Sequence, residues 1–285
     1  MADDPFLTAE LRARVLDAWA ASPARFREDA NAEEDYALGG YRDRVVVELA
    51  QNAADAAVRA NVPGRLRLRL RDGVLTAANT GAPLDAAGVE ALSTLRASSK
   101  RDSSSTGRFG VGFAAAVAVS DAPSIRSVTG AVRWSRSETL ALAGELEPLA
   151  AEIAARSSHV PVLRLPFSSS DAPPEGFVTE VVLPLRDDET IALVGRLLEE
   201  TGAALLLALP ALASVVIETD SFTRELTAAH SPDEVMVTVD GVRTRWRRMQ
   251  RRRPCMTLVK AWQRFWRSGS RCGTRRPRIC ADERG

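Results

Sequence analysis

The sequence predicts an α+β protein, and three observations lead to that class. Segments with the apolar spacing of helices and segments with the apolar–polar alternation of strands both occur along the chain. They do not follow each other in the strict strand–helix–strand rhythm that a doubly wound parallel sheet requires. A leucine–arginine alternation that ends at Asp72-Gly73 is typical of a β hairpin.

Helices are expected first in the chain. Thr8 can cap a helix with an apolar face that includes Leu11 and Trp19. Pro23 suits the first position of a second helix, because its missing N–H would have no partner there anyway. Residues 41–60 contain no Gly or Pro and are rich in Ala, Val and Leu. They therefore predict a long helix.

The hairpin follows these helices. Residues 66–70 alternate Leu and Arg, which predicts a half-buried strand, and residues 74–78 form the returning strand. A loop over residues 79–83 comes next, and Asp85 can cap a short helix that ends near residue 92. The polar, Ser-rich stretch 93–106 is expected to be a mobile loop. Further strands are expected near residues 124–129, 131–136, 162–165, 178–183, 214–218, 222–227 and 235–240, with helices near 138–155 and 189–200.

Charge divides the chain into two regions. The whole chain of 285 residues has a net charge of +1, but Val242–Gly285 holds 15 basic and 2 acidic residues. The preceding 241 residues hold 23 basic and 35 acidic residues. We therefore predict one domain over 1–241, with a helical N-terminal segment (1–40) and a motif core (41–130), followed by a basic tail over 242–285.

The tail has two interpretations. Arginine interleaved with tryptophan suits phosphates and stacked bases, as in a nucleic-acid-binding segment. Alternatively, the composition changes because the reading frame does. The chain has 36 arginines and two lysines, which indicates a GC-rich coding sequence, and an out-of-frame read of such a sequence is enriched in Arg, Cys, Trp and Pro. We favour the second interpretation, in which the tail lacks native structure.

Several classes of protein are excluded or disfavoured. Residues 1–241 contain no cysteine, which excludes a disulfide scaffold or a thiolate metal site there. The acidic N-terminus lacks the apolar region of a secretory signal. The longest uncharged run, Thr201–Ile217, is interrupted by Pro210 and is short for a membrane span. A cytoplasmic protein without a membrane contact is expected.

Three sequence signals carry chemistry. In the first, Glu48, Asn52 and Asp55 have the spacing i, i+4 and i+7, which places them on one face of the long helix. A carboxylate can activate water there, and an amide can ligate a hard cation. Taken alone, the same stripe is more typical of a helix face that meets water.

The second signal is the segment from Gly107 to Phe113, in which Gly110, Val111 and Gly112 form a G-x-x-G-x-G pattern before an apolar stretch. A glycine-rich turn that opens a helix favours phosphate, because backbone N–H groups and the helix dipole point toward the anion. A flexible hinge before a core helix would look the same. No phosphate-binding P-loop motif occurs in the chain.

The third signal is Lys100, the sole lysine before Lys260. It follows Ser99 and lies seven residues before the glycine segment, from where a compact ammonium could reach a phosphate. In isolation, a solvated surface lysine explains it as well.

Together these signals resemble the GHKL ATPases, in order and in spacing. Residues 48–56 are similar to the N-box of that superfamily, and residues 107–113 are similar to its glycine box. Ser99-Lys100 resemble the residues that precede its lid. The glycine segment and Val119-Ser120-Asp121 look like the heat-shock protein 90 branch. Ser-Ser-Lys and Asn79 to Leu84 look like the sacsin N-terminal relatives of that branch.

This resemblance implies the Bergerat fold, a two-layer α/β sandwich whose mixed sheet carries helices on one face. It implies a chaperone-like protein that binds ATP and Mg²⁺, with Glu48 as general base and Asn52 as Mg²⁺ ligand. Asp55, Ser99, Lys100 and the glycine segment, Gly107 to Phe113, would contact or support the nucleotide.

The adenine loop departs from the family pattern Asp-x-Gly-x-Gly. Here it reads Asn79-Thr80-Gly81-Ala82-Pro83, so an amide replaces the carboxylate and proline replaces the second glycine. An amide oxygen can still accept one hydrogen bond from adenine, without charge assistance.

Three functions stay open at this point. The first is a slow ATPase of the chaperone-like class, since relatives take a catalytic arginine from a further domain that this chain is too short to contain. The second is a non-catalytic ATP-binding switch. The third is nucleic-acid binding through the tail. A client or partner protein is not identified by the sequence.

Overall fold

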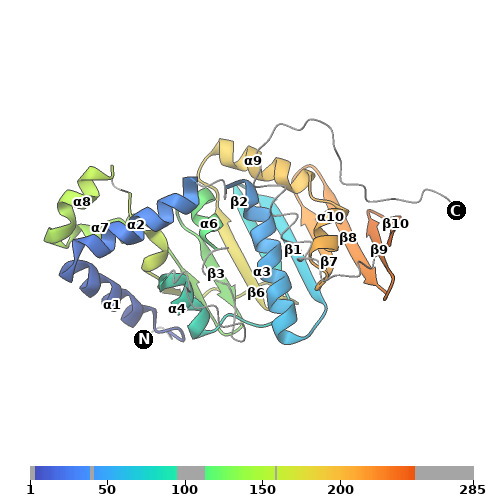
Figure 1. Cartoon of the computed structure of the whole chain (residues 1–285), viewed down its shortest axis with the longest axis horizontal. Coiled ribbons are helices and arrows are strands. Elements are labelled where there is room, and N and C mark those ends of the chain that lie inside the picture. Colours follow the sequence, from blue (N-terminus) through green and yellow to red (C-terminus); the bar gives the residue numbers. More distant parts are fainter. Residues whose placement is uncertain (1–3, 39–41, 95–112, 158, 248–285) are drawn as a thin grey trace, which may run out of the picture.

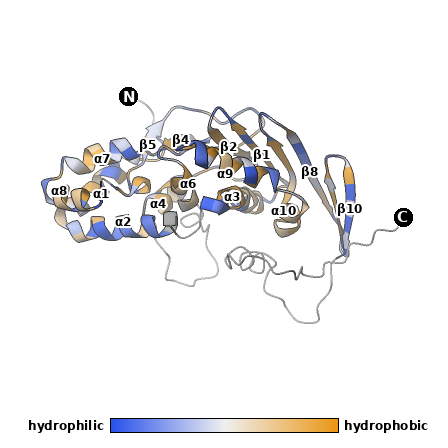
Figure 2. Ribbon diagram, turned by 90° about the horizontal axis from the view of Figure 1, so that it is seen from above, coloured by the Kyte–Doolittle hydropathy of each residue, from blue (hydrophilic) through white to orange (hydrophobic). Residues whose placement is uncertain are grey.

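The computed structural model describes residues 4–38, 42–94, 113–157 and 159–247. In this part of the chain one mixed sheet forms a layer, and helices cover one of its faces, so the predicted two-layer α/β sandwich is confirmed (Figures 1 and 2). The helices are α1 (Thr8–Ala21), α2 (Pro23–Leu38), α3 (Val45–Ala60), α4 (Ala86–Thr94), α6 (Ala114–Val119), α7 (Arg136–Gly144), α8 (Ala150–Ala155), α9 (Asp188–Glu199) and α10 (Ala203–Ala208), with 3-10 turns η1 (Arg42–Arg44), η2 (Glu147–Leu149) and η3 (Val162–Arg164).

The described sheet runs in the order β10-β9-β8-β7-β1-β2-β6-β3-β4-β5. Its neighbouring strands are antiparallel, apart from β1 and β7, which pair in parallel. The strands are β1 (Gly64–Arg71), β2 (Val74–Asn79), β3 (Ser124–Ser127), β4 (Gly130–Arg133), β5 (Phe167–Ser169), β6 (Thr179–Pro184), β7 (Leu212–Glu218), β8 (Thr223–His230), β9 (Glu234–Val239) and β10 (Val242–Arg247).

The hairpin at the centre of the sheet forms as predicted. Leu66, Leu68 and Leu70 of β1 are buried on the helix-covered face, while the intervening arginines lie on the open face. Asp72 and Gly73 both have positive φ, which is the conformation that a two-residue turn between antiparallel strands requires.

The helices enclose two hydrophobic clusters. The larger one lies between the sheet and α3, α9 and α10, and we call this part of the molecule the sheet layer. The smaller one contains Trp19, Phe26, Leu149 and Leu165, which come from α1, α2 and the segment around α7, α8 and η3. We call this second part the helical cluster; it lies at one end of the sheet (Figure 1).

Two predicted elements are wrong in type or extent. Residues 162–165 were expected to be a strand but include η3, because the backbone N–H groups of Val162 and Leu163 donate to the carboxylate of Glu33 instead of to a sheet. The single helix expected over 138–155 is divided into α7, η2 and α8. Leu146 is extended, and Pro148 lacks the N–H that a continuous helix would donate to the carbonyl oxygen of Gly144.

The sheet continues past the predicted domain boundary. β9 and β10 form a hairpin, so Val242–Arg247, the first six residues of the predicted tail, belong to the sheet. A boundary after residue 241 is therefore too early. Residues 248–285 lie outside the described residues. Within the described part of the chain, no helix combines the length and the hydropathy that crossing a membrane requires.

Candidate functional site

The predicted polar stripe lies on α3, which packs on the central strand β1. Glu48, Asn52 and Asp55 share one face of this helix, since the conformation is helical throughout Val45–Ala60. Asn52 and Asp55 are partly exposed, whereas Glu48 is buried with 9% of its surface accessible. The face therefore combines one desolvated carboxylate with two polar groups that ligands can reach.

The carboxylate of Glu48 is held by an arginine of the preceding turn. A guanidinium nitrogen of Arg44 lies 3.0 Å from its Oε1, and both side chains are largely buried. Burial raises the pKa of Glu48, the charge of Arg44 opposes this rise, and the charge of Asp55 adds to it. A carboxyl with a raised pKa is suited to accept a proton near neutral pH.

The loop after β2 packs directly on this helix. Gly81 has a φ of +123°, and a Cβ atom at this position would lie 2.5 Å from the carbonyl carbon of Ala56. The next residue, Ala82, donates its backbone N–H to the carbonyl oxygen of Ala56 at 2.9 Å. A glycine is needed here because no side chain fits between loop and helix. The close approach brings the predicted adenine loop next to the helix that carries the first sequence signal.

Asn79 ends β2 at the base of this loop. Its side chain is 7% exposed and lies on the helix-covered side of the sheet. The amide Nδ2 donates to the carbonyl oxygen of Thr80 at 3.0 Å. Because a carbonyl can only accept, this bond identifies the nitrogen and directs Oδ1 the other way. Among the described residues no hydrogen bond to Oδ1 is found, so the oxygen can accept one from a ligand.

The glycine segment is described only at its end. Phe113 is buried and packs against Trp134 with ring centroids 5.3 Å apart, so its side chain belongs to the core and anchors the start of α6. Any contact of this residue with a nucleotide would therefore use its backbone. The other predicted residues of the lid and the glycine segment lie outside the described residues: Ser99, Lys100, Gly107, Gly110, Val111 and Gly112.

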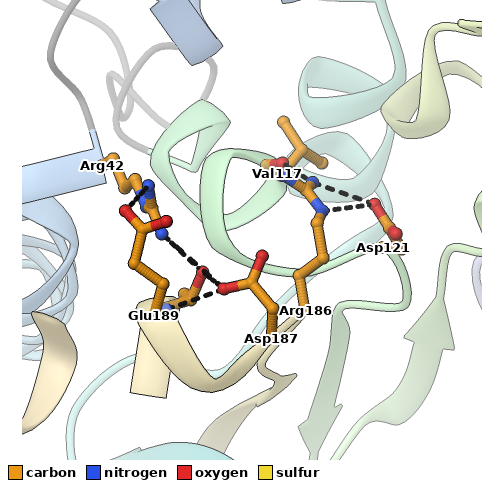
Figure 3. A network of polar contacts seen from close by, with 7 residues as sticks. Arg42, Val117, Asp121, Arg186, Asp187 and Glu189 are labelled. Carbon is orange, nitrogen blue, oxygen red and sulfur yellow. Dashed lines mark hydrogen bonds and ion pairs between the residues drawn. The ribbon is translucent and has the colours of Figure 1, made fainter. Parts of the chain in front are cut away.

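A polar network joins the start of α3 to the start of α9 (Figure 3). Arg42 of η1 donates to Glu189 at 3.1 Å and to the hydroxyl of Thr190 at 2.8 Å. Asp187 caps α9 by accepting from the backbone N–H of Thr190 at 2.8 Å, and lies 3.8 Å from Arg42. The N-terminal end of the helix that carries Glu48 is thereby fixed to its neighbour.

The same turn holds the helix that follows the glycine segment. Arg186 contacts Asp121 through Nε at 3.0 Å and through a terminal nitrogen at 2.9 Å, and it donates to the carbonyl oxygen of Val117 at 2.9 Å (Figure 3). Two consecutive residues, Arg186 and Asp187, thus connect α6 and α3 to the β6–α9 turn. Their contacts set the relative position of two helices that border the candidate site.

Sequence reasoning missed Arg44, Arg42 and Arg186. The spacing of Arg44 and Glu48 at i and i+4 could have revealed the first, since opposite charges at that distance meet on a helix. The other two arginines contact residues more than 60 positions away, and no local pattern announces such contacts.

Comparison with known proteins does not assign this chain to a family. No model of a protein family matches its sequence, and no curated protein matches it either.

Proposed function

We propose that this protein binds Mg-ATP at the face of α3 that carries Glu48, Asn52 and Asp55, and hydrolyses it slowly. The proposal adopts the likeness to the chaperone branch of the GHKL ATPases on the residues quoted above. The observation that carries it is the packing of the Asn79–Gly81 loop on α3, which requires a glycine at position 81. Because the loop lies next to the α3 face, an adenine and a phosphate chain bound there could contact residues distant in sequence.

Each residue then has a defined task. Oδ1 of Asn79 accepts a hydrogen bond from the adenine amino group, since its Nδ2 is already used by Thr80. The amide oxygen of Asn52 ligates Mg²⁺, a cation that commonly takes few protein ligands and completes its shell with phosphate oxygens and water. Bound Mg²⁺ would neutralise developing charge on the phosphates. Glu48 accepts a proton from the attacking water.

The pair between Arg44 and Glu48 supports slow turnover. At 3.0 Å the guanidinium competes with water for the carboxylate, so part of the pair has to open before Glu48 can act as a base. The same contact favours a second candidate function. If the pair stays closed with nucleotide bound, the protein is an ATP-binding switch without turnover.

A calorimetric titration of the full chain with ATP, with and without Mg²⁺, tests the proposal. We expect Mg²⁺-dependent binding that Asn52→Ala weakens at least tenfold. Val58→Ala serves as the control, because Val58 is exposed on the same helix. Absence of binding to the folded protein would contradict the proposal.

Turnover separates the two candidates. We expect Glu48→Ala to retain ATP binding and to lose hydrolysis by about 100-fold or more, the usual contribution of a general base. Binding without hydrolysis in the unchanged protein would select the switch. The cytoplasmic location, a client protein and nucleic-acid binding by the tail stay predictions from the sequence.

A further inference from the structure

A cavity of about 240 Å³ lies where the helical cluster meets α4, apart from the α3 face. Its walls come from α1, α2, α4 and η3, and neither the α3 stripe nor Asn79 contributes to it. Liquid water takes about 30 Å³ per molecule, so this volume corresponds to roughly eight waters or a small organic molecule.

One wall of the cavity is apolar and the opposite wall is charged. Leu11, Val15, Ala18 and Trp19 provide the apolar wall from successive turns of α1. The charged wall contains a buried arginine, Arg164, which is only 3% exposed. A ligand in the cavity would therefore meet hydrocarbon on one side and guanidinium on the other.

Arg164 is held in place but retains hydrogen-bonding capacity. It donates to the carbonyl oxygen of Ser93 at 3.2 Å, and another of its nitrogens lies 2.9 Å from Oδ1 of Asp29. Its Nε is buried and has no hydrogen-bond partner among the described residues. A guanidinium carries five N–H groups, and the contacts with Ser93 and Asp29 use two of them, so its terminal nitrogens can still donate to a ligand.

The charges on the cavity wall do not cancel. The second oxygen of Asp29 accepts from the indole N–H of Trp19 at 3.0 Å and lies 4.0 Å from Arg25. Arg14 and Glu90 form an exposed pair at 3.5 Å between α1 and α4. Among the residues that line the cavity, three arginines thus face two carboxylates. Glu33 also acts on Arg164, but burial raises the pKa of Glu33 to about 7, so below that pH the lining keeps an excess of one positive charge.

We propose that this cavity binds a small organic monoanion: a carboxylate on an apolar body of about the size of a phenyl ring. The carboxylate would lie at Arg25 and Arg164, and the ring would lie along Val15 and Ala18. The site is independent of the ATP site proposed above. A ligand of this size binds with a dissociation constant of roughly 1 mM, given ordinary ligand efficiency.

The test titrates the full chain with 4-phenylbutyrate as the probe. Binding is monitored by the NMR cross-peak of the Trp19 indole N–H. That peak is identified by its loss in Trp19→Phe. We expect saturable shifts with a millimolar midpoint. 4-Phenylbutan-1-ol, which lacks the charge, and acetate, which lacks the ring, should each bind at least tenfold more weakly.

Three variants locate the site. Ala18→Phe fills the cavity from an exposed helix position and should abolish the shifts, while Ala13→Phe, exposed on the same helix but away from the cavity, should leave them unchanged. Arg25→Gln should weaken binding about fivefold. Circular dichroism of each variant verifies folding. No saturation at 10 mM probe, equal binding of the alcohol, or full binding by Ala18→Phe would overturn the proposal.

Discussion

The sheet layer and the helical cluster differ in how their helices pack and in how their buried carboxylates are held. In the sheet layer α3 approaches the strands through small residues: Gly81 and Gly64 lie against Ala56 and Ala57, and one carboxylate, Glu48, is held by an arginine on its own helix. In the helical cluster, large rings such as Trp19 and Phe26 pack edge to face, with centroids 5.1 Å apart.

The buried carboxylates show the difference most clearly. Glu33 in α2 is 2% exposed and accepts two backbone N–H groups, from Val162 at 2.7 Å and from Leu163 at 3.1 Å. Both of its oxygens are used to hold another segment of the chain. Glu48 accepts no such backbone bond among the described residues. We infer that Glu33 serves the fold, whereas the position of Glu48 is better suited to chemistry.

The largest effect is expected from Gly81→Ala. The substitution requires a positive φ for a non-glycine residue and places a Cβ at 2.5 Å from Ala56, which together should cost about 4 kcal/mol of unfolding free energy. Gly144→Ala is the control, since nothing lies within 4 Å of a Cβ there. Urea unfolding measures both. Similar stability of the two variants would show that loop and α3 are not closely packed.

The second largest loss of stability is expected from Glu33→Ala, measured by urea unfolding at pH 6. It leaves two buried N–H groups without an acceptor, and we expect a loss of about 3 kcal/mol. Glu33→Gln retains one acceptor oxygen and should lose about half as much. Equal losses would mean that packing around Glu33, rather than hydrogen bonding to η3, provides the stability.

A pH series tests the same residue with a smaller effect. Burial raises the pKa of Glu33 from 4.5 to about 7, against the opposing influence of the two N–H groups and Arg164. The folded state therefore prefers the protonated acid. This contribution is fully present below pH 4.5 and is lost as the pH rises through 7. Its loss should lower the free energy of unfolding by about 2 kcal/mol between pH 5 and pH 8.

Comparison with Glu33→Gln isolates this effect from other titrating groups. His159 has a lowered pKa, because it is desolvated, and its contribution changes with pH in the opposite direction. It is present in both proteins and cancels in the difference. If the two pH profiles run parallel, Glu33 is ionised throughout the range in the folded protein.

The sheet layer is the part that the sequence predicted best. Its elements carry local signals: alternating leucines in β1, a turn at Asp72-Gly73, and an aspartate that caps α4 through Gly88. The helical cluster was predicted less well. The shape of η3 depends on Glu33, which lies about 130 positions earlier, and such long-range hydrogen bonding leaves no periodic pattern.

The candidate site, too, could be predicted from the sequence only in part. The spacing of the α3 residues follows from helix geometry, and the glycine at position 81 follows from a motif. The arginines that frame the site do not. Arg186 reaches Asp121 across 65 positions, and sequence alone could not select this pair among 36 arginines.

Arg186→Gln tests the connection between the β6–α9 turn and α6. It removes the two contacts with Asp121 and the bond to Val117, and because the pair is partly exposed we expect a loss of only about 1 kcal/mol. Arg136→Gln removes a longer, 3.5 Å contact with the same aspartate and should lose less. Thermal unfolding of both variants provides the measurement. The reverse ranking would indicate that Arg136 is the main anchor of α6.

The smallest change in stability is expected where the functional effect is proposed to be largest. In Glu48→Gln the loss of the ion pair with Arg44 is offset by removal of a desolvated charge that Asp55 also disfavours, so unfolding free energy should change by less than about 1 kcal/mol. Urea unfolding at pH 7 measures it, with Glu33→Gln as the matched substitution in the helical cluster. Residues used in catalysis are commonly poor for stability, whereas structural residues are not. A loss at Glu48 as large as that at Glu33 would remove this distinction and favour a structural role for both carboxylates.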